Sequence, residues 1–199
     1  MKVNTIVLVC LCLVWIPEVS ASEWQVQRQF PQGVLYSRIL PPSGRTQFKI
    51  EGTVEADIEE VIELFRNIDT YPEWFGYCNK ALELEPYSKD HRLFYMVIDA
   101  PWPVRDRKVI NDVRFDVSES NARITFEEAS WIHVDFDQQY IRIPYLQGSC
   151  EVDELKEHLC NVTFILTLDP GGDIPRRFAD SFTKDHLLKI YDGLKRMLN

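Results

Sequence analysis

The sequence predicts an α+β fold in which a strongly curved antiparallel β-sheet wraps around a long C-terminal helix. Two observations lead to this prediction. Short runs of alternating apolar and polar residues, joined by short turns, fill most of the chain between residues 81 and 168, which is typical of an antiparallel meander. One capped helix precedes this region and one long amphipathic helix follows it, so the helices lie outside the main run of strands.

The expected strands are short segments in which side chains of opposite character alternate, as in half-buried strands. They cover residues 34–36, 48–54, 81–85, 93–100, 108–117, 123–126, 139–145, 148–153 and 159–168. The last strand must end at residues 169–173, because the sequence Asp-Pro-Gly-Gly-Asp contains a proline and paired glycines.

A helix is expected between the second and third of these strands. Asp57 is a good N-cap, and Glu60 follows three residues later as in a capping box. Apolar residues then form one stripe, made of Ile58, Val61, Ile62 and Phe65. We expect this helix to end near Asn67 and to be followed by a short second helix or turn at residues 70–76.

Residues 175–198 form the longest helix candidate. Its apolar residues recur at roughly helical spacing and are Phe178, Phe182, Leu187, Ile190, Tyr191, Leu194 and Met197 or Leu198. A curved sheet that grips one helix leaves a space between them, and this space must be filled by side chains or by a ligand.

The N-terminus resembles a secretory signal. Lys2 precedes an apolar run at residues 6–16, and Val19-Ser20-Ala21 offers the small residues that signal peptidase prefers. The run is shorter than the ~20 residues that a membrane span needs, so a cleaved signal is favoured over an uncleaved anchor. We therefore expect a signal peptide at residues 1–21 and a secreted or periplasmic protein with one domain at residues 22–199.

The charge of the chain argues against nucleic-acid partners. The sequence has 22 Lys and Arg against 31 Asp and Glu, a formal net charge of -9 at pH 7. Loss of the leader leaves this value unchanged, because Lys2 and Glu18 cancel. Polyanions bind to clustered Lys and Arg, so binding of nucleic acid is disfavoured.

Three cysteines lie outside the leader. If residues 146–164 form a hairpin centred on Leu155, Cys150 and Cys160 face each other across the ladder, and an oxidising compartment would allow a disulfide between them. The alternative is two unpaired, buried thiols. Cys78 has no predicted partner.

Three further patterns follow one another along the chain. They are Tyr71-Pro72-Glu73-Trp74 after the first helix, Pro101-Trp102-Pro103-Val104-Arg105-Asp106-Arg107 at a strand start, and Leu168-Asp169-Pro170-Gly171-Gly172-Asp173-Ile174-Pro175 before the last helix. In order and spacing they resemble bacterial members of the START lipid-transfer domains, within the Bet v 1-like helix-grip superfamily. This resemblance spans nearly the whole mature chain. It implies a helix-grip fold whose cavity, between the sheet and the C-terminal helix, binds a lipid or other hydrophobic molecule.

Seven side chains are candidates for contact with such a ligand. They are Phe65, Trp74, Phe94, Met96, Arg107, Phe178 and Phe182. An ordinary core would use the same aromatic residues, and the alternation in residues 93–98 does not show which parity faces inward. The chain also departs from the family pattern, because Cys150 stands where many members have a tryptophan after Gly148, and Asp180 replaces a common asparagine.

The prolines of the second pattern explain its crowded, charged sequence. Pro101 and Pro103 fix the backbone, end one strand and aim the next, and we expect Trp102 to cover the corner. The alternation that follows puts one set of side chains on the same face, namely Arg105, Arg107, Val109, Asn111 and Val113.

The resemblance implies that this face looks inward and that Arg107 takes the place of the family arginine, with Lys108 in place of the family aspartate. Arg105 and Asp106 offer a second register. In the functional interpretation, Arg107 binds a carboxylate, phosphate or hydroxyl head group. In the structural one, it pairs with a neighbouring acidic side chain and only stabilises the sheet. A buried charge needs a partner in either case, so we expect a carboxylate or a water network there.

Patterns for catalysis or metal binding are weak. His133, Asp135 and Asp137 would share one strand face, but alternation with apolar residues favours a solvated face over a metal site. The histidines form no zinc-protease motif, and no nucleophile elbow occurs. We assign no catalytic residue, no metal ligand and no cofactor.

These observations favour a monomeric carrier of a lipid or another hydrophobic small molecule that contacts membranes transiently. Release would require the terminal helix or the loop at Gly171-Gly172 to move aside. Two alternatives stay open. One is an enzyme similar to the aromatase/cyclase members of the superfamily, acting on a hydrophobic substrate in the same cavity. The other is a protein whose interior is filled by its own side chains and whose surface binds a partner.

Overall fold

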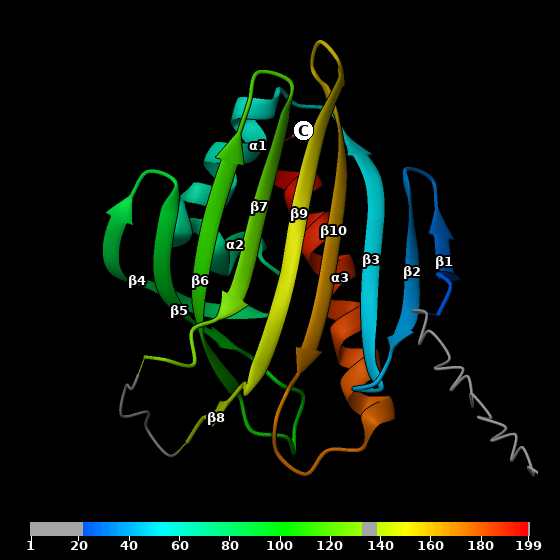
Figure 1. The fold of residues 1–199 in the computed structure, drawn as a ribbon, viewed down its shortest axis with the longest axis vertical. Helices are drawn as coiled ribbons and strands as arrows, with labels where there is room; N and C mark the ends of the chain where they lie inside the picture. Colours follow the sequence, from blue (N-terminus) through cyan, green and yellow to red (C-terminus); the bar gives the residue numbers. More distant parts are fainter. Residues whose placement is uncertain (1–21, 133–138, 199) are drawn as a thin grey trace, which may run out of the picture.

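The computed structural model describes residues 22–132 and 139–198, apart from the side chains of residues 85–87. These residues form one ten-stranded sheet with the strand order β1-β2-β3-β10-β9-β7-β6-β5-β4, and β8 pairs with β6. Neighbours in this order are antiparallel, whereas β8 runs parallel to β6. The sheet curves around the C-terminal helix (Figure 1), so the predicted α+β helix-grip fold is confirmed. The expected leader and the segment His133 to Asp137 lie outside the described residues.

Most strands are longer than the sequence patterns predicted. They are β1 (Gln25–Phe30), β2 (Gly33–Leu40), β3 (Arg45–Val54), β4 (Cys78–Ser88), β5 (His91–Ile98), β6 (Arg107–Val117), β7 (Asn121–Glu128), β8 (Ile141–Arg142), β9 (Tyr145–Lys156) and β10 (Leu159–Asp169). Between them lie α1 (Ile58–Arg66), the 3-10 helix η1 (Ile68–Thr70) and α2 (Tyr71–Trp74), and α3 (Arg176–Leu198) follows the last strand.

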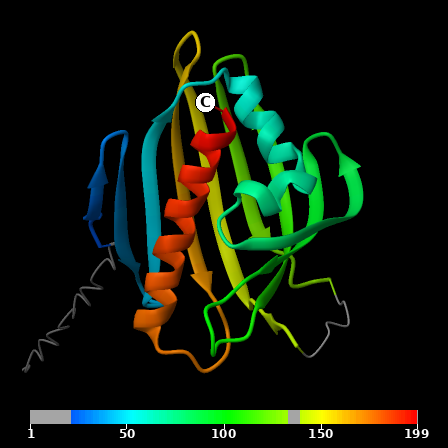
Figure 2. The ribbon, with the colours of Figure 1, turned by 180° about the vertical axis from the view of Figure 1, so that it is seen from behind.

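The helices cover one face of the sheet. Figure 2 shows α3 running along the concave face, with α1 and α2 beside it. α3 packs against β3 and β10, and α2 packs against β4 and α3. Among the described residues, no helix combines the length and the apolar character that crossing a bilayer requires.

The predicted capping box is present at the start of α1. The carboxylate of Glu60 accepts a hydrogen bond from the backbone N–H of Asp57 over 2.9 Å. The predicted apolar stripe of this helix is buried, from Ile58 to Phe65. Local sequence and core packing therefore agree on where α1 begins and which side it buries.

α3 lies unusually close to α2. A Cβ atom built on Gly193 would lie 2.1 Å from the carbonyl oxygen of Trp74, so only glycine allows this approach. Leu187, Ile190 and Leu194 from the predicted stripe are buried, whereas Phe178 near the start of the helix is 66% exposed. The first turns of α3 therefore extend beyond the packed core.

One strand was missed and one strand prediction was wrong. β1 was missed because its sequence, QVQRQF, contains only two apolar residues and lies almost entirely exposed. Only Ile141–Arg142 of the expected strand 139–145 is a strand, while Tyr145 already belongs to β9. This short strand pairs with only two residues of β6, which gives too few side chains for an alternating pattern.

The predicted Cys150–Cys160 disulfide is absent, and both thiols are free and buried. The turn lies at residues 157–158, where His158 has a φ of 57°, rather than at Leu155. Cys150 pairs with Phe164 and Cys160 with Glu154, so the two cysteines are offset by four residues along the ladder (164 − 160). At ~3.3 Å per residue this offset is about 13 Å, far beyond the ~7 Å that a disulfide tolerates between Cα atoms.

Candidate ligand-binding site

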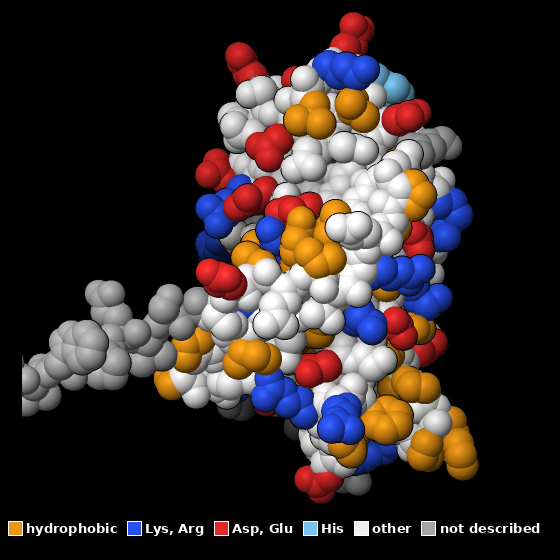
Figure 3. Space-filling view, turned by 90° about the vertical axis from the view of Figure 1, so that its right-hand side faces the viewer, with side chains coloured by type: hydrophobic (Ala, Val, Ile, Leu, Met, Phe, Trp, Pro, Cys, Tyr) orange, Lys and Arg blue, Asp and Glu red, His pale blue; other side chains and the backbone are white. Residues whose placement is uncertain are grey.

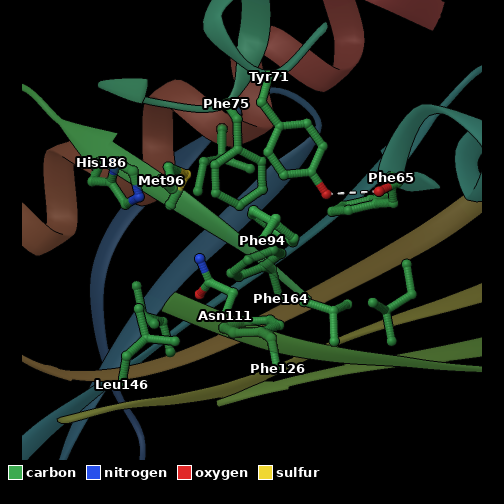
Figure 4. Close-up of a pocket in the computed structure, with 14 residues that line it drawn as sticks. Phe65, Tyr71, Phe75, Phe94, Met96, Asn111, Phe126, Leu146, Phe164 and His186 are labelled. Atoms are coloured by element: carbon green, nitrogen blue, oxygen red, sulfur yellow. Dashed lines mark hydrogen bonds between the residues drawn. The ribbon is translucent and has the colours of Figure 1, made fainter. Parts of the chain in front are cut away.

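An apolar cavity lies between the concave face of the sheet and the helices (Figure 4). The strands β5, β6, β7, β9 and β10 contribute Phe94, Met96, Asn111, Val113, Ile124, Phe126, Leu146, Phe164 and Leu166. The helical side contributes Phe65, Tyr71, Phe75, His186 and Ile190. Successive strand residues in this lining are two apart, because alternate side chains of a strand point to the same face.

Aromatic rings fill much of this space. The ring centroids of Phe126 and Phe164 lie 5.2 Å apart, and those of Tyr71 and Phe75 stack at 4.7 Å. The cavity volume is only about 40 Å³. The cavity is therefore narrow, and a larger ligand needs some rings to move.

A glycine makes room for one of these rings. Gly148 faces Phe126 across the β7–β9 ladder, and a Cβ at that position would lie 2.4 Å from the phenyl ring. Gly148 therefore has a direct role in shaping the cavity wall.

Three polar groups reach the cavity lining. Tyr71 donates its hydroxyl hydrogen to the carbonyl oxygen of Phe65 over 2.6 Å, and burial raises the pKa of this phenol. The ring of His186, which is 4% exposed, accepts a hydrogen bond at Nδ1 from the backbone N–H of Tyr77 over 3.3 Å. Burial lowers the pKa of His186 to about 4, so the ring is neutral at pH 7.

Asn111 is the third polar group, and it is 3% exposed. Its Nδ2 atom is buried and has no hydrogen-bond partner among the described residues. Figure 4 shows this amide pointing into the space between the labelled rings. An unmet, buried donor is rare in folded proteins and calls for a physical explanation.

The seven candidate residues do not share one site. Phe65, Phe94 and Met96 line the cavity. Trp74 is buried behind it and packs edge-on against Phe65, with centroids 5.2 Å apart. The other three, Arg107, Phe178 and Phe182, line a separate pocket where the β5–β6 connection, the β10–α3 connection and the start of α3 meet. We call this second space the outer pocket.

Arg107 is 4% exposed, and its hydrogen bonds go to backbone carbonyl groups. Nε donates to Pro170 and Nη2 to Gly171, each over 3.3 Å, and Nη1 donates to Arg105. Burial and then the neighbouring charge of Arg105 lower the pKa of this guanidinium. The expected carboxylate partner is absent from these hydrogen bonds, because the β10–α3 connection supplies carbonyl oxygens in its place.

The comparison with known proteins agrees with this architecture. The START domain matches residues 15–199. The chain belongs to the START domain family. It is 24% identical over 175 residues to an uncharacterised protein of Pseudomonas aeruginosa. The match covers 88% of this chain and 86% of that protein.

Solved structures share the START fold at low sequence identity. The STAR-related lipid transfer protein of Xanthomonas axonopodis matches with a TM-score of 0.78 and 18% identity, covering 87% of this chain and 97% of that one. The Zhui aromatase/cyclase of Streptomyces matches with a TM-score of 0.57 and 11% identity, covering 76% and 92% of the two chains. At these identities the likeness shows a common fold.

In this START domain, a stack of three rings separates the outer pocket from the cavity. Tyr77 and Phe182 line the outer pocket, and their centroids lie 4.9 Å apart. His186 lines the cavity and stacks on both, at 6.2 Å from Tyr77 and 6.3 Å from Phe182. We call Tyr77, Phe182 and His186 the partition.

The loop beside the outer pocket exposes a tryptophan. Trp102 is 93% exposed, so the expectation that it covers the strand corner was wrong. Its loop closes on itself instead, since the backbone N–H of Val104 donates to Pro101 over 3.0 Å. Figure 3 shows hydrophobic side chains gathered at the lower end of the START domain, and Figure 2 shows that this loop and the start of α3 lie at that end.

One cluster of potential metal ligands lies on the surface of the START domain. The side chains of Asp57, Glu60 and His158 have ligand atoms within 4.8 Å of one another, and all three are exposed. Asp57 accepts the backbone N–H of His158 over 3.1 Å, and Glu60 accepts that of Asp57, so capping and hairpin contacts explain their positions.

Sequence analysis did not single out Asn111 and His186, although both left a signal. Asn111 interrupts the apolar run of β6 on the face that was expected to look inward. His186 follows Phe182 and precedes Ile190 by four residues each, on the buried side of α3. A polar residue at a core position of a regular pattern was the available clue.

Proposed function

We propose that this START domain binds a lipid or other hydrophobic small molecule in the cavity between the sheet and α3, and that it carries this molecule unchanged. The observation that supports the proposal is the lining, in which aromatic and aliphatic side chains surround only three polar groups. Burial of apolar ligand surface contributes about 25 cal/mol per Å², so such a lining favours apolar ligands.

Access through the partition fits the arrangement of the two pockets. The outer pocket lies beside α3, and two rings of its lining, Tyr77 and Phe182, stack on His186 of the cavity lining. Gly171 and Gly172 both have positive φ angles, of 67° and 72°, in the connection that precedes α3. We infer that rotation of the partition rings, together with movement of this connection, admits the ligand.

The test is to fill the cavity and measure binding. Val113→Phe places a larger side chain in the lining, whereas Val117→Phe adds the same group at the exposed end of the same strand. We expect the neutral fluorophore N-phenyl-1-naphthylamine to bind the wild type and Val117→Phe equally, and Val113→Phe at least about tenfold more weakly because of overpacking. Lipids extracted from the purified proteins should follow the same order. Equal binding by both variants would place the ligand elsewhere.

The composition of the cavity favours a carrier over an aromatase/cyclase-like enzyme. The lining contains no carboxylate, lysine or arginine among the described residues, and its titratable groups are Tyr71 and His186. Tyr71 already donates its proton to a backbone carbonyl, and its raised pKa opposes its ionisation. Recovery of the bound ligand with unchanged mass after incubation supports carriage, and a change in mass supports the enzyme.

We also propose that the protein is exported, loses residues 1–21 and works as a monomer in contact with membranes. The signal-like leader and the exposed apolar side chains beside the outer pocket support this proposal. N-terminal sequencing of the chain from the periplasm or medium should begin near Ser22, and light scattering should give the mass of one chain. Retention of Met1 on a cytoplasmic product would contradict export.

A further inference from the structure

The amide of Asn111 is the polar group that the fold leaves unexplained. It lies on β6 opposite Phe94 and faces the cavity, where the neighbouring lining residues are apolar or aromatic. Nδ2 has no partner among the described residues, although it is enclosed. A leucine of similar size would have avoided this loss of hydration, so the amide is costly unless something in the cavity binds it.

His186 lines the same cavity. Because Nδ1 accepts the N–H of Tyr77, the neutral ring carries its proton on Nε2. Within the described chain the ring forms no other hydrogen bond, so this Nε2–H is free to donate. Tyr71 does not compete for the same role, since its hydroxyl hydrogen goes to Phe65.

We propose that Asn111 and His186 together bind one uncharged oxygen atom, a hydroxyl or a carbonyl, carried by an otherwise apolar ligand. This inference rests on the proposed function and specifies the chemical class of the ligand. Nδ2 of Asn111 and Nε2 of His186 donate to the oxygen. A ligand hydroxyl can also donate its hydrogen to Oδ1 of Asn111, so an alcohol satisfies more of the amide than a ketone does.

The cavity is unsuited to an ionised head group. A carboxylate or phosphate there would lose its hydration with no lysine or arginine in the described lining to pair with. The guanidinium of Arg107 lies at the outer pocket, and its hydrogen bonds go to backbone carbonyl groups. Neutral lipids therefore match the cavity better than their anionic counterparts.

A bound water molecule is the alternative occupant. A buried water usually makes about three hydrogen bonds, and the cavity offers the amide of Asn111 and Nε2 of His186. Water and a ligand oxygen would bind to the same donors. The two cases differ in one measurable way, because only a ligand oxygen makes the order of ligand affinities depend on the amide of Asn111.

The experiment measures displacement of N-phenyl-1-naphthylamine by decane, 1-decanol, 2-decanone and decanoate at pH 7. The variant is Asn111→Leu, and the control is Met96→Leu, an apolar exchange on the neighbouring strand of the same wall. We expect Asn111→Leu to weaken the binding of 1-decanol about tenfold and that of 2-decanone severalfold. Decane and the fluorophore should bind to this variant as they do to the wild type. Met96→Leu should leave the order of the four ligands unchanged. Decanoate should bind more weakly than 1-decanol to the wild type.

Two results would overturn the inference and leave the proposed function intact. One is an equal effect of Asn111→Leu on 1-decanol and decane, which would mean that the amide binds only water. The other is preferred binding of decanoate. Failure of the fluorophore and of all four ligands to bind the folded wild type would instead reject the proposed function. Retained binding of the fluorophore by Asn111→Leu shows that the variant is folded.

Discussion

Nη2 of Arg107 donates a hydrogen bond to the carbonyl oxygen of Gly171 over 3.3 Å, joining the start of β6 to the connection that leads into α3. The contact links residues that are 64 positions apart in the chain. Nε of the same side chain donates a hydrogen bond to the carbonyl oxygen of Pro170. Arg107, for which the sequence left a head-group role and a structural role open, therefore anchors the loop beside the outer pocket.

Replacement of this arginine should loosen the loop and leave ligand preference unchanged. Arg107→Met keeps the apolar stem but removes all donors, so we expect a loss of about 2 kcal/mol in the free energy of unfolding. Amide hydrogen exchange should rise at residues 171–174. Arg177→Met, at an exposed position of α3, is the matched control and should change neither quantity. If Arg107→Met instead lost decanoate binding selectively, this result would support a role of Arg107 in binding the ligand head group.

These contacts illustrate which features the sequence could predict. Alternation placed Arg107 and Asn111 on one face of β6, and the resemblance implied that this face looks inward; both side chains are buried. They lie four residues apart, which is about 13 Å along a strand, and α3 crosses the sheet so that only Asn111 faces the cavity. That crossing depends on contacts between distant segments, such as Gly193 with Trp74, which no local pattern records.

The same reasoning explains the missed elements. α1 was predictable because its cap and its buried stripe lie within ten residues. The β9–β10 register was not, because the turn at Glu157 and His158 contains no glycine or proline, and His158 has a positive φ that few non-glycine residues adopt.

The exposed tryptophan of the β5–β6 connection should contribute to membrane contact. We expect Trp102→Ala to weaken binding to phosphatidylcholine vesicles at least about threefold, because interfacial binding scales with the apolar area that enters the lipid. Leu155→Ala is the control, since Leu155 is 56% exposed on the β9–β10 hairpin at the opposite end of the sheet (Figure 1). Vesicle co-sedimentation measures the membrane binding of both variants. An equal effect of the two substitutions would argue against a specific membrane-facing end.

The close approach of α3 and α2 makes an unusual prediction about helix propensity. Alanine in place of a mid-helix glycine normally stabilises a helix by about 1 kcal/mol. Gly193→Ala should instead lower the free energy of unfolding by about 2 kcal/mol, because its Cβ would lie 2.1 Å from the oxygen of Trp74. Urea denaturation tests this, with Ser181→Ala on the exposed side of α3 as the control. Stabilisation by Gly193→Ala would show that the two helices separate easily.

Cys78, Cys150 and Cys160 should remain free and unreactive in the folded protein. All are buried, and burial raises the pKa of Cys160 to about 11 and that of Cys78 to about 12. Iodoacetamide without reductant should add no label to the folded chain of residues 22–199 and three labels after unfolding, as measured by intact mass. A single label after unfolding would mean that two cysteines are joined, against the register of β9 and β10.

His186 should make the stability of the protein depend on pH in a defined window. Its pKa is about 4 in the folded protein against about 6.5 when exposed, since burial among Phe75, Tyr77 and Phe182 penalises the charged ring. The unfolded chain therefore binds a proton first as the pH falls. The contribution of the neutral ring is complete above pH 6.5, is lost between pH 6.5 and about 4, and reaches about 3 kcal/mol.

Carboxylates titrate in part of this window, so the comparison needs a variant that lacks only the imidazole. His186→Gln can keep the hydrogen bond from the N–H of Tyr77 through its side-chain oxygen. Urea denaturation at pH 7, 6, 5 and 4 should show the wild type losing about 3 kcal/mol more than the variant, with most of the difference below pH 6. Parallel curves for the two proteins would mean that the ring of His186 is already hydrated in the native state, and that the partition is open rather than closed.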